Sequence, residues 1–299
     1  MAPDPETVLT RLSVDLSTAL GDSLLSLCVH GSWVVGDFLI GRSDLDVLGV
    51  LSDDPSAATL RSLTGVHESL VRDFPEWSDH VEVEYVSPAA VRDVLLGGGQ
   101  IHPMVRISPG EPIHLIEASR HYLLNWHAAL QHDRVLAGRS PRDVLPEIET
   151  PLVQQVVVGH LVQWPDWVAP MTSPGGQAYS VLTICRAVAT LQTGRQLSKR
   201  AAADYGVSVL PEWAALIGWA RAWWYAGGLD TDPGRYREVL TFVGSVAPAM
   251  ADRYRERRRS ETARTLQGPG CQHTQRDDHR QHVDEIGGGG GNRTRVLER

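Results

Sequence analysis

Apolar residues in the first third of the chain follow two different periods. They recur every three or four positions in two segments, and in three others they run together or alternate with polar residues. These patterns predict helices at 5–20 and 55–74 and strands at about 24–30, 45–52 and 80–86. Strands that alternate with helices in this way are typical of a small mixed sheet with covering helices.

The pattern is less regular between this region and the second half of the chain. Residues 97–112 are rich in glycine and proline, which predicts a loop long enough to close over a bound substrate. A helix at 115–130, a short strand at 134–138 and a brief helix capped at Ser140 are predicted after it. We expect a domain boundary at 147–151.

From residue 152 onward the apolar period is helical throughout. It predicts helices near 152–163, 177–193, 198–205, 211–226 and 234–257. Glycine, proline or serine separates most of these segments, as in a helical bundle, and Trp164–Trp167 is predicted to lie in a rigid loop between two of them. The sequence therefore predicts an α+β protein with a mixed-sheet domain at 1–148 and an all-α bundle domain at 149–257.

The last segment of the chain differs in kind. Residues 258–299 contain five consecutive glycines at 287–291, scattered histidine and glutamine, and almost nothing apolar to bury. Such a composition cannot offset the entropy of ordering the chain. We predict a disordered tail at 258–299.

The composition of the chain indicates which kinds of molecule it could bind. The 299 residues include 36 acidic and 28 basic ones, for a formal net charge of −8, and the isoelectric point is near 5.8. This balance argues against a general nucleic-acid surface and suits a small cationic substrate. Three widely spaced cysteines predict neither a disulfide framework nor a metal knuckle. With no leader sequence or membrane-length apolar run, we expect a soluble, cytoplasmic protein. We also expect it to be a monomer.

Candidate chemistry is concentrated between two predicted strands. Gly31 and Ser32 follow the first strand, and Asp44 and Asp46 open the second. Side chains in a strand change face at every residue, so the two carboxylates point the same way and repel each other unless a cation lies between them. A hard divalent ion such as Mg²⁺, carrying nucleotide phosphates, fits such oxygen ligands. Gly31 permits close backbone approach, and Ser32 at a helix start suits phosphate binding.

Each half of this pattern alone is more often structural, because Asp-x-Asp is common on exposed strands and Gly-Ser is usually a turn. Their combination, with eleven residues between Ser32 and Asp44, is much more specific. A third carboxylate is available on the next strand, where Glu82 and Glu84 share one face. Either could complete the metal shell or act as a general base, and an acidic edge strand is the alternative interpretation.

These motifs resemble the nucleotidyltransferase superfamily typified by DNA polymerase beta. The second half adds four segments, Asp166-Trp167, Val181–Arg186, Thr193–Arg195 and Ser198–Tyr205, that resemble the helical domain of the aminoglycoside adenylyltransferases acting on streptomycin and spectinomycin. The resemblance covers about residues 5–255, and its nucleotide-side motifs are the more specific part.

The resemblance implies roles for individual residues. Gly31, Ser32, Ser43, Arg186 and Lys199 would bind the ATP phosphates. Asp44 and Asp46 would hold Mg²⁺, Glu82 would be the general base, and Trp167 would contact the substrate. Arg186 and Lys199 would act from the second domain, across an active site lying between the two. Without the resemblance, both would be interpreted as exposed helix cations.

The substrate side departs from the family pattern. The family has acidic residues for the cationic drug where this chain has Gly176 and Gln177, and a neutral amide cannot replace a carboxylate toward an ammonium group. The aromatic residue that the family places after the glutamate strand is missing from 97–112.

Together these features predict a Mg²⁺-dependent nucleotidyltransferase that transfers AMP from ATP to a hydroxyl of a small molecule, such as an aminoglycoside or aminocyclitol antibiotic. Two alternatives stay open. The acceptor could be a protein or an RNA end, or the chain could be a nucleotide-binding module without catalysis.

Overall fold

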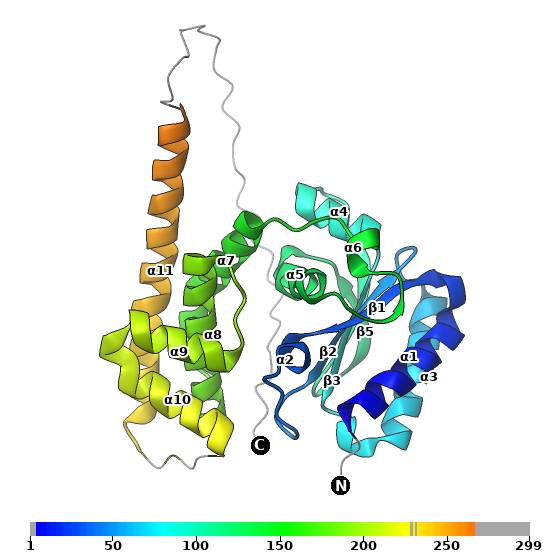
Figure 1. The fold of residues 1–299 in the computed structure, drawn as a ribbon, viewed down its shortest axis with the longest axis horizontal. Coiled ribbons are helices and arrows are strands. Elements are labelled where there is room, and N and C mark those ends of the chain that lie inside the picture. The colour runs from blue at the N-terminus through cyan, green and yellow to red at the C-terminus, as the bar shows by residue number, and fades with distance from the viewer. Residues whose placement is uncertain (1–3, 228–229, 231, 267–299) are drawn as a thin grey trace, which may run out of the picture.

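The computed structural model describes residues 4–227, 230 and 232–266. Within them the chain forms a sheet with covering helices, followed by a bundle of helices that stands beside it (Figure 1). The predicted α+β fold, a mixed sheet followed by an all-helical region, is thus confirmed. None of the described helices has the length and apolar character needed to span a membrane.

The sheet is mixed and has the strand order β5-β4-β3-β2-β1-β6. Its strands are β1 (Leu24–His30), β2 (Leu45–Leu51), β3 (Val81–Val86), β4 (Pro103–Ser108), β5 (Glu111–Glu117) and β6 (Arg134–Gly138). β2 and β3 are parallel, and the other neighbours are antiparallel. A parallel pair needs a crossover connection, which α3 (Ala57–Asp73) provides after a capping box of Ser56 and Thr59.

Alternation along β2 creates an apolar layer on each face of the sheet. Leu45 and Val47 pack on the face covered by α1 and α3, whereas Leu48 and Val50 pack on the face covered by α5. The other elements here are α1 (Pro5–Leu20), α2 (Gly31–Val34), α4 (Pro88–Leu96), α5 (Leu123–His132), α6 (Pro141–Val144) and the 3-10 turns Gly21–Ser23, Pro75–Trp77 and Arg120–Tyr122. Asp46 alternates onto the α5 face, so the candidate site lies on that side of the sheet.

The helical region is built around α8. Its elements are α7 (Thr150–Val168), α8 (Pro174–Thr193), α9 (Lys199–Val209), the 3-10 turn Pro211–Trp213, α10 (Ala214–Ala226) and α11 (Arg235–Leu266). α8 contributes fully buried Val181, Ile184 and Val188 to a core that the other four helices close. Cys28 and Cys185 are buried free thiols, and Cys271 lies outside the described residues.

The predicted loop at 97–112 is correct only up to residue 102, and the predicted helix at 115–130 is correct only from Leu123. β4 and β5 form an antiparallel hairpin there, and α5 begins only at Leu123. β4 pairs with β3, so that Arg106 stands opposite Glu84. This pairing across the sheet stabilises a segment whose local composition is typical of a loop, and Pro103 is tolerated as the first residue of its strand.

The predicted loop at Trp164–Trp167 is also wrong, because α7 continues through Pro165 to Val168. Leu161, Trp164 and Val168 are all buried and extend one apolar stripe, so packing of this last turn on the bundle outweighs the hydrogen bond that proline removes. At the other end of the bundle, α11 runs to Leu266 rather than ending near 257. The remainder of the predicted tail, 267–299, lies outside the described residues, and the predicted domain limits stay predictions.

Candidate active site

The junction of β1 and α2 brings the Gly-Ser pair against the second aspartate. Gly31 starts α2 with a φ of +67°, a conformation that favours glycine. A Cβ added at Gly31 would lie 1.9 Å from Oδ2 of Asp46, so the carboxylate of Asp46 occupies the space that a side chain would need. Gly31 and Asp46 are therefore direct neighbours in the structure. Ser32, in α2, is half-buried.

Three carboxylates gather on one face of β2 and β3. Asp46 stands opposite Glu82 in the parallel ladder, and Asp44, two residues before Asp46, alternates to the same face. Burial raises the pKa of Asp46 well above its usual range, and Glu82 and Asp44 raise it further. Nδ1 of His80 lies 3.1 Å from Oδ1 of Asp44 and orients that carboxylate. The group is electrostatically costly as it stands, which is a property of cation-binding sites.

Glu82 is held in place by an arginine from β4. Arg106 donates from Nη2 to Oε1 of Glu82 at 2.8 Å, and from Nη1 to Oε2 of Glu111 at 3.3 Å. Burial raises the pKa of Glu82, Arg106 opposes this shift, and Asp44 and Glu111 add to it. A carboxylate with a raised pKa beside a binding site suits proton transfer near neutral pH. Arg106 was not among the predicted site residues, because its strand was predicted to be a loop.

Glu84 shares a strand face with Glu82 but has different surroundings. Nδ2 of Asn125 donates to Oε1 of Glu84 at 2.7 Å, and Nε1 of Trp126 donates to Oε2 at 2.9 Å. The residue is 2% exposed, and burial together with the charge of Glu82 raises its pKa to about 8. Both oxygens are engaged by α5, so the structure favours Glu82 over Glu84 as the group that meets a substrate.

Two cations of the helical region interact with the two aspartates. Burial and the charge of Arg186 lower the pKa of Lys199 to about 8, whereas Asp46 and Asp44 oppose that shift. The ammonium of Lys199 lies 4.4 Å from the ring centroid of Trp224 and 5.6 Å from that of Tyr179, an aromatic enclosure that sequence reasoning did not identify. A cation there can stabilise negative charge that develops beside Asp44 and Asp46.

Three further predicted site residues have the following surroundings. Ser43 is buried, and its Oγ accepts a hydrogen bond from the backbone N–H of Leu39 at 3.0 Å. The guanidinium of Arg186 donates from Nε to the carbonyl of Leu197 at 3.1 Å. Trp167 is half-buried, and its ring centroid lies 5.7 Å from that of His160.

Comparison with known proteins agrees with this arrangement. Residues 143–248 match the family model described as aminoglycoside adenylyltransferase, C-terminal domain. No curated protein matches the chain significantly by sequence. Among solved structures, the fold is similar to a spectinomycin adenyltransferase, AAD(9), from Enterococcus faecialis, solved with ATP and spectinomycin. The TM-score is 0.63 at 15% identity, over 82% of this chain and 100% of that one. The family match covers the helical region of the chain, and the likeness to the solved structure shows that the two chains share a fold.

Proposed function

We propose that the protein transfers AMP from ATP to a hydroxyl of a small aminocyclitol or aminoglycoside antibiotic, and thereby confers resistance to it. The observation that carries the proposal is the placement of Asp44, Asp46 and Glu82 on one sheet face, within electrostatic range of Lys199 and Arg186 from the helical domain. Carboxylates for a metal and a base, opposite cations for phosphates, are the parts that nucleotidyl transfer needs.

The residues present fit Mg²⁺. Asp44 and Asp46 would hold the ion, since they offer hard oxygen ligands and their mutual repulsion is relieved by a cation. In 4–227, 230 and 232–266, no group of three or more His, Cys, Asp or Glu side chains is arranged to hold a metal by itself. Mg²⁺ is usually held by one or two carboxylates together with substrate phosphates, and Asp44 and Asp46 supply two carboxylates. The bound ion would supply positive charge to the oxygens of the reacting phosphate.

Side chains of the protein bind the triphosphate and accept the proton. Lys199 and Arg186, with Ser32 and Ser43, bind the triphosphate and neutralise the charge that accumulates on departing pyrophosphate. Glu82 accepts the proton of the acceptor hydroxyl, whose oxygen attacks the α-phosphorus as the bond to pyrophosphate breaks. The proton ends on Glu82, and AMP ends on the acceptor oxygen.

The acceptor side favours a substrate that does not depend on carboxylates at the start of α8. Gln177 is 4% exposed, and its Nε2 donates to the carbonyl of Thr172 at 2.7 Å, so its amide serves the helix start rather than a ligand. Spectinomycin is the first acceptor to test, because the similar structure was solved with it. Streptomycin is the second.

A pyrophosphate-release assay with ATP and Mg²⁺ tests the proposal directly. We expect release that depends on both the metal and spectinomycin or streptomycin, with the adenylylated drug found by mass spectrometry. Labelled ATP incubated with cell lysate distinguishes the alternatives, because label would enter polymer if the acceptor were a protein or RNA. Calorimetric ATP binding without pyrophosphate release on any acceptor would instead indicate a binding module and contradict the proposal.

Replacing Gly31 with Ala should reduce transfer by about a hundredfold or more, because the new Cβ collides with Asp46 and displaces its carboxylate. Gly36→Ala is a matched control. Gly36 has a similar φ of +70°, but a Cβ there meets nothing within 4 Å. Both substitutions strain the backbone and should lower the free energy of unfolding by about 1 kcal/mol. Pyrophosphate release and melting temperature measure the two effects, and equal activity in the two variants would contradict the assigned role of Gly31.

A further inference from the structure

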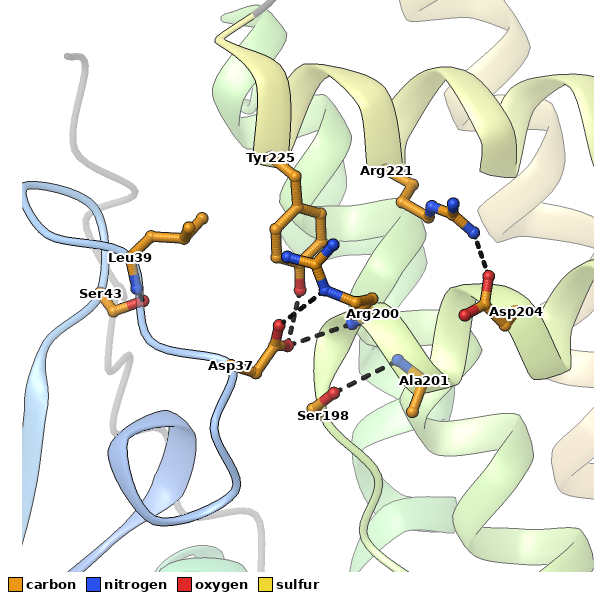
Figure 2. A network of polar contacts seen from close by, with 9 residues as sticks. All are labelled: Asp37, Leu39, Ser43, Ser198, Arg200, Ala201, Asp204, Arg221 and Tyr225. Carbon is orange, nitrogen blue, oxygen red and sulfur yellow. Dashed lines mark hydrogen bonds and ion pairs between the residues drawn. The ribbon is translucent and has the colours of Figure 1, made fainter.

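The segment between α2 and Ser43 contacts the helical domain at two points. Nη1 of Arg42 donates to the carbonyls of Trp223 at 2.8 Å and Trp224 at 2.5 Å, in the last turn of α10. Its guanidinium carbon also lies 4.7 Å from the ring centroid of Trp223. Asp37 forms the second point, on α9 and α10 (Figure 2). Hydrogen bonds thus join the segment that precedes Asp44 to the domain that carries Lys199.

Asp37 receives three hydrogen bonds from the other domain. Its Oδ2 accepts from the backbone N–H of Arg200 at 3.2 Å and from the hydroxyl of Tyr225 at 2.6 Å, and its Oδ1 accepts from Nε of Arg200 at 3.2 Å. The side chain of Asp37 is 7% exposed. Burial would raise its pKa, but the hydrogen bonds from Tyr225 and from the backbone and side chain of Arg200, together with the nearby Ser198 hydroxyl, outweigh it and lower the pKa. Asp37 is therefore a buried, ionised carboxylate with all its described partners across the domain boundary.

These bonds reach the first turn of α9, where N–H groups have no partner inside the helix. Oγ of Ser198 accepts from the N–H of Ala201 at 3.2 Å, which is an ordinary N-cap. Asp37 accepts from the N–H of Arg200, so it caps the same turn from another domain (Figure 2). Lys199 is the first residue of this helix, and the charge of Asp37 also attracts its ammonium.

We propose that Asp37 is a positioning residue for nucleotide binding. By capping α9 across the domain boundary, it holds Lys199 opposite Asp44 and Asp46 before the nucleotide arrives. The inference rests on the proposed function, since it assigns Lys199 to the triphosphate. Its consequence is that ATP binding does not have to bring the two domains together, which increases affinity because less order is created on binding.

The test is ATP affinity, measured by calorimetry with Mg²⁺ on the full chain. Asp37→Asn keeps the shape of the side chain and removes its charge, and we expect it to weaken ATP binding about tenfold, as the loss of charge-assisted hydrogen bonds predicts. The control is Asp204→Asn. Asp204 forms an ion pair with Arg221 between α9 and α10, within the helical domain and exposed to solvent (Figure 2). We expect that variant to bind ATP within about twofold of the unmodified protein.

A double-mutant cycle separates positioning from general stability. In a Lys199→Met background, Asp37→Asn should change ATP affinity less than about twofold, because its effect acts through Lys199. If Asp37→Asn does not fold, Arg200→Met, which removes one of the three bonds, should show a smaller loss with the same dependence on Lys199. Additive losses, or an Asp37 variant indistinguishable from Asp204→Asn, would overturn the inference. Failure of the unmodified protein to bind ATP would instead overturn the proposed function.

Discussion

Replacing Asp46 with Asn should abolish AMP transfer and leave the protein folded. Asp46 is the carboxylate that touches Gly31 and stands opposite Glu82, so it contributes both charge and position to the proposed magnesium site. An amide keeps the shape but loses the negative charge that a hard cation requires. We expect activity to fall by about a thousandfold or more, since the ion stabilises charge on the reacting phosphate. Pyrophosphate release under saturating ATP measures the loss.

The melting temperature of Asp46→Asn is a second property that tests the assignment. Burial, Glu82 and Asp44 raise the pKa of Asp46, so between its unfolded and folded pKa values the native protein holds a proton that the unfolded chain has released. The stability of the unmodified protein without metal therefore falls as pH rises through that window. Asp46→Asn has no such penalty, and at neutral pH it should melt no lower than the unmodified protein.

Magnesium should reverse the order of the melting temperatures of the unmodified protein and Asp46→Asn. Mg²⁺ with ATP should raise the melting temperature of the unmodified protein, because a ligand of the native state stabilises it, and should have little effect on Asp46→Asn. Asp73→Asn, which alters a partly exposed ion pair with Arg11 at a distance from the site, controls for the loss of one acidic residue. A folded Asp46→Asn protein with full activity would refute the metal assignment.

The nucleotide side of the site could be predicted because its parts are close in sequence. Gly31 directly follows β1, a short segment joins it to the neighbouring strand β2, and alternation places Asp44 and Asp46 on one face. Local pattern and tertiary structure therefore agree at these positions, and this agreement is why the family resemblance could be read from the motif.

The rest of the site depends on contacts that no local pattern contains. Arg106 reaches Glu82 only because β4 pairs with β3, and the composition around β4 predicted a loop. Asp37 and Tyr225 are 188 positions apart, and nothing near either residue indicates the other. Trp167 was predicted to lie in a loop, whereas packing of Trp164 and Val168 keeps that segment helical. In each case a tertiary contact outweighs the local preference.

The sequence of β3 alone likewise could not decide whether Glu82 or Glu84 is the general base. The strict alternation of β3 makes the two residues equivalent, and only α5 distinguishes them, by placing Asn125 and Trp126 over the oxygens of Glu84. Glu82 instead faces Arg106 and the aspartates. The distinction therefore belongs to the packing of a helix that begins some forty residues later in the chain.

Glu82→Gln should lower turnover by about two to four powers of ten, because an amide cannot accept the proton of the acceptor hydroxyl. The pH profile identifies the cause. Burial, Asp44 and Glu111 raise the pKa of Glu82 against the opposing effect of Arg106, so kcat/KM of the unmodified protein should fall toward low pH below a pKa higher than that of an ordinary glutamate. This acid limb should be absent from the residual activity of Glu82→Gln.

Glu84→Gln is the comparison that decides whether the base is assigned correctly. Its amide would turn an N–H toward a donor, either Asn125 or Trp126, in a residue that is 2% exposed, so we expect a lower melting temperature. Turnover should stay within about tenfold, because Glu82 still accepts the proton. If Glu84→Gln instead loses turnover by more than a hundredfold and abolishes the acid limb, while Glu82→Gln retains both, then Glu84 is the base. In that case α5 would have to move away from β3 during the reaction to release the oxygens that Asn125 and Trp126 now hold.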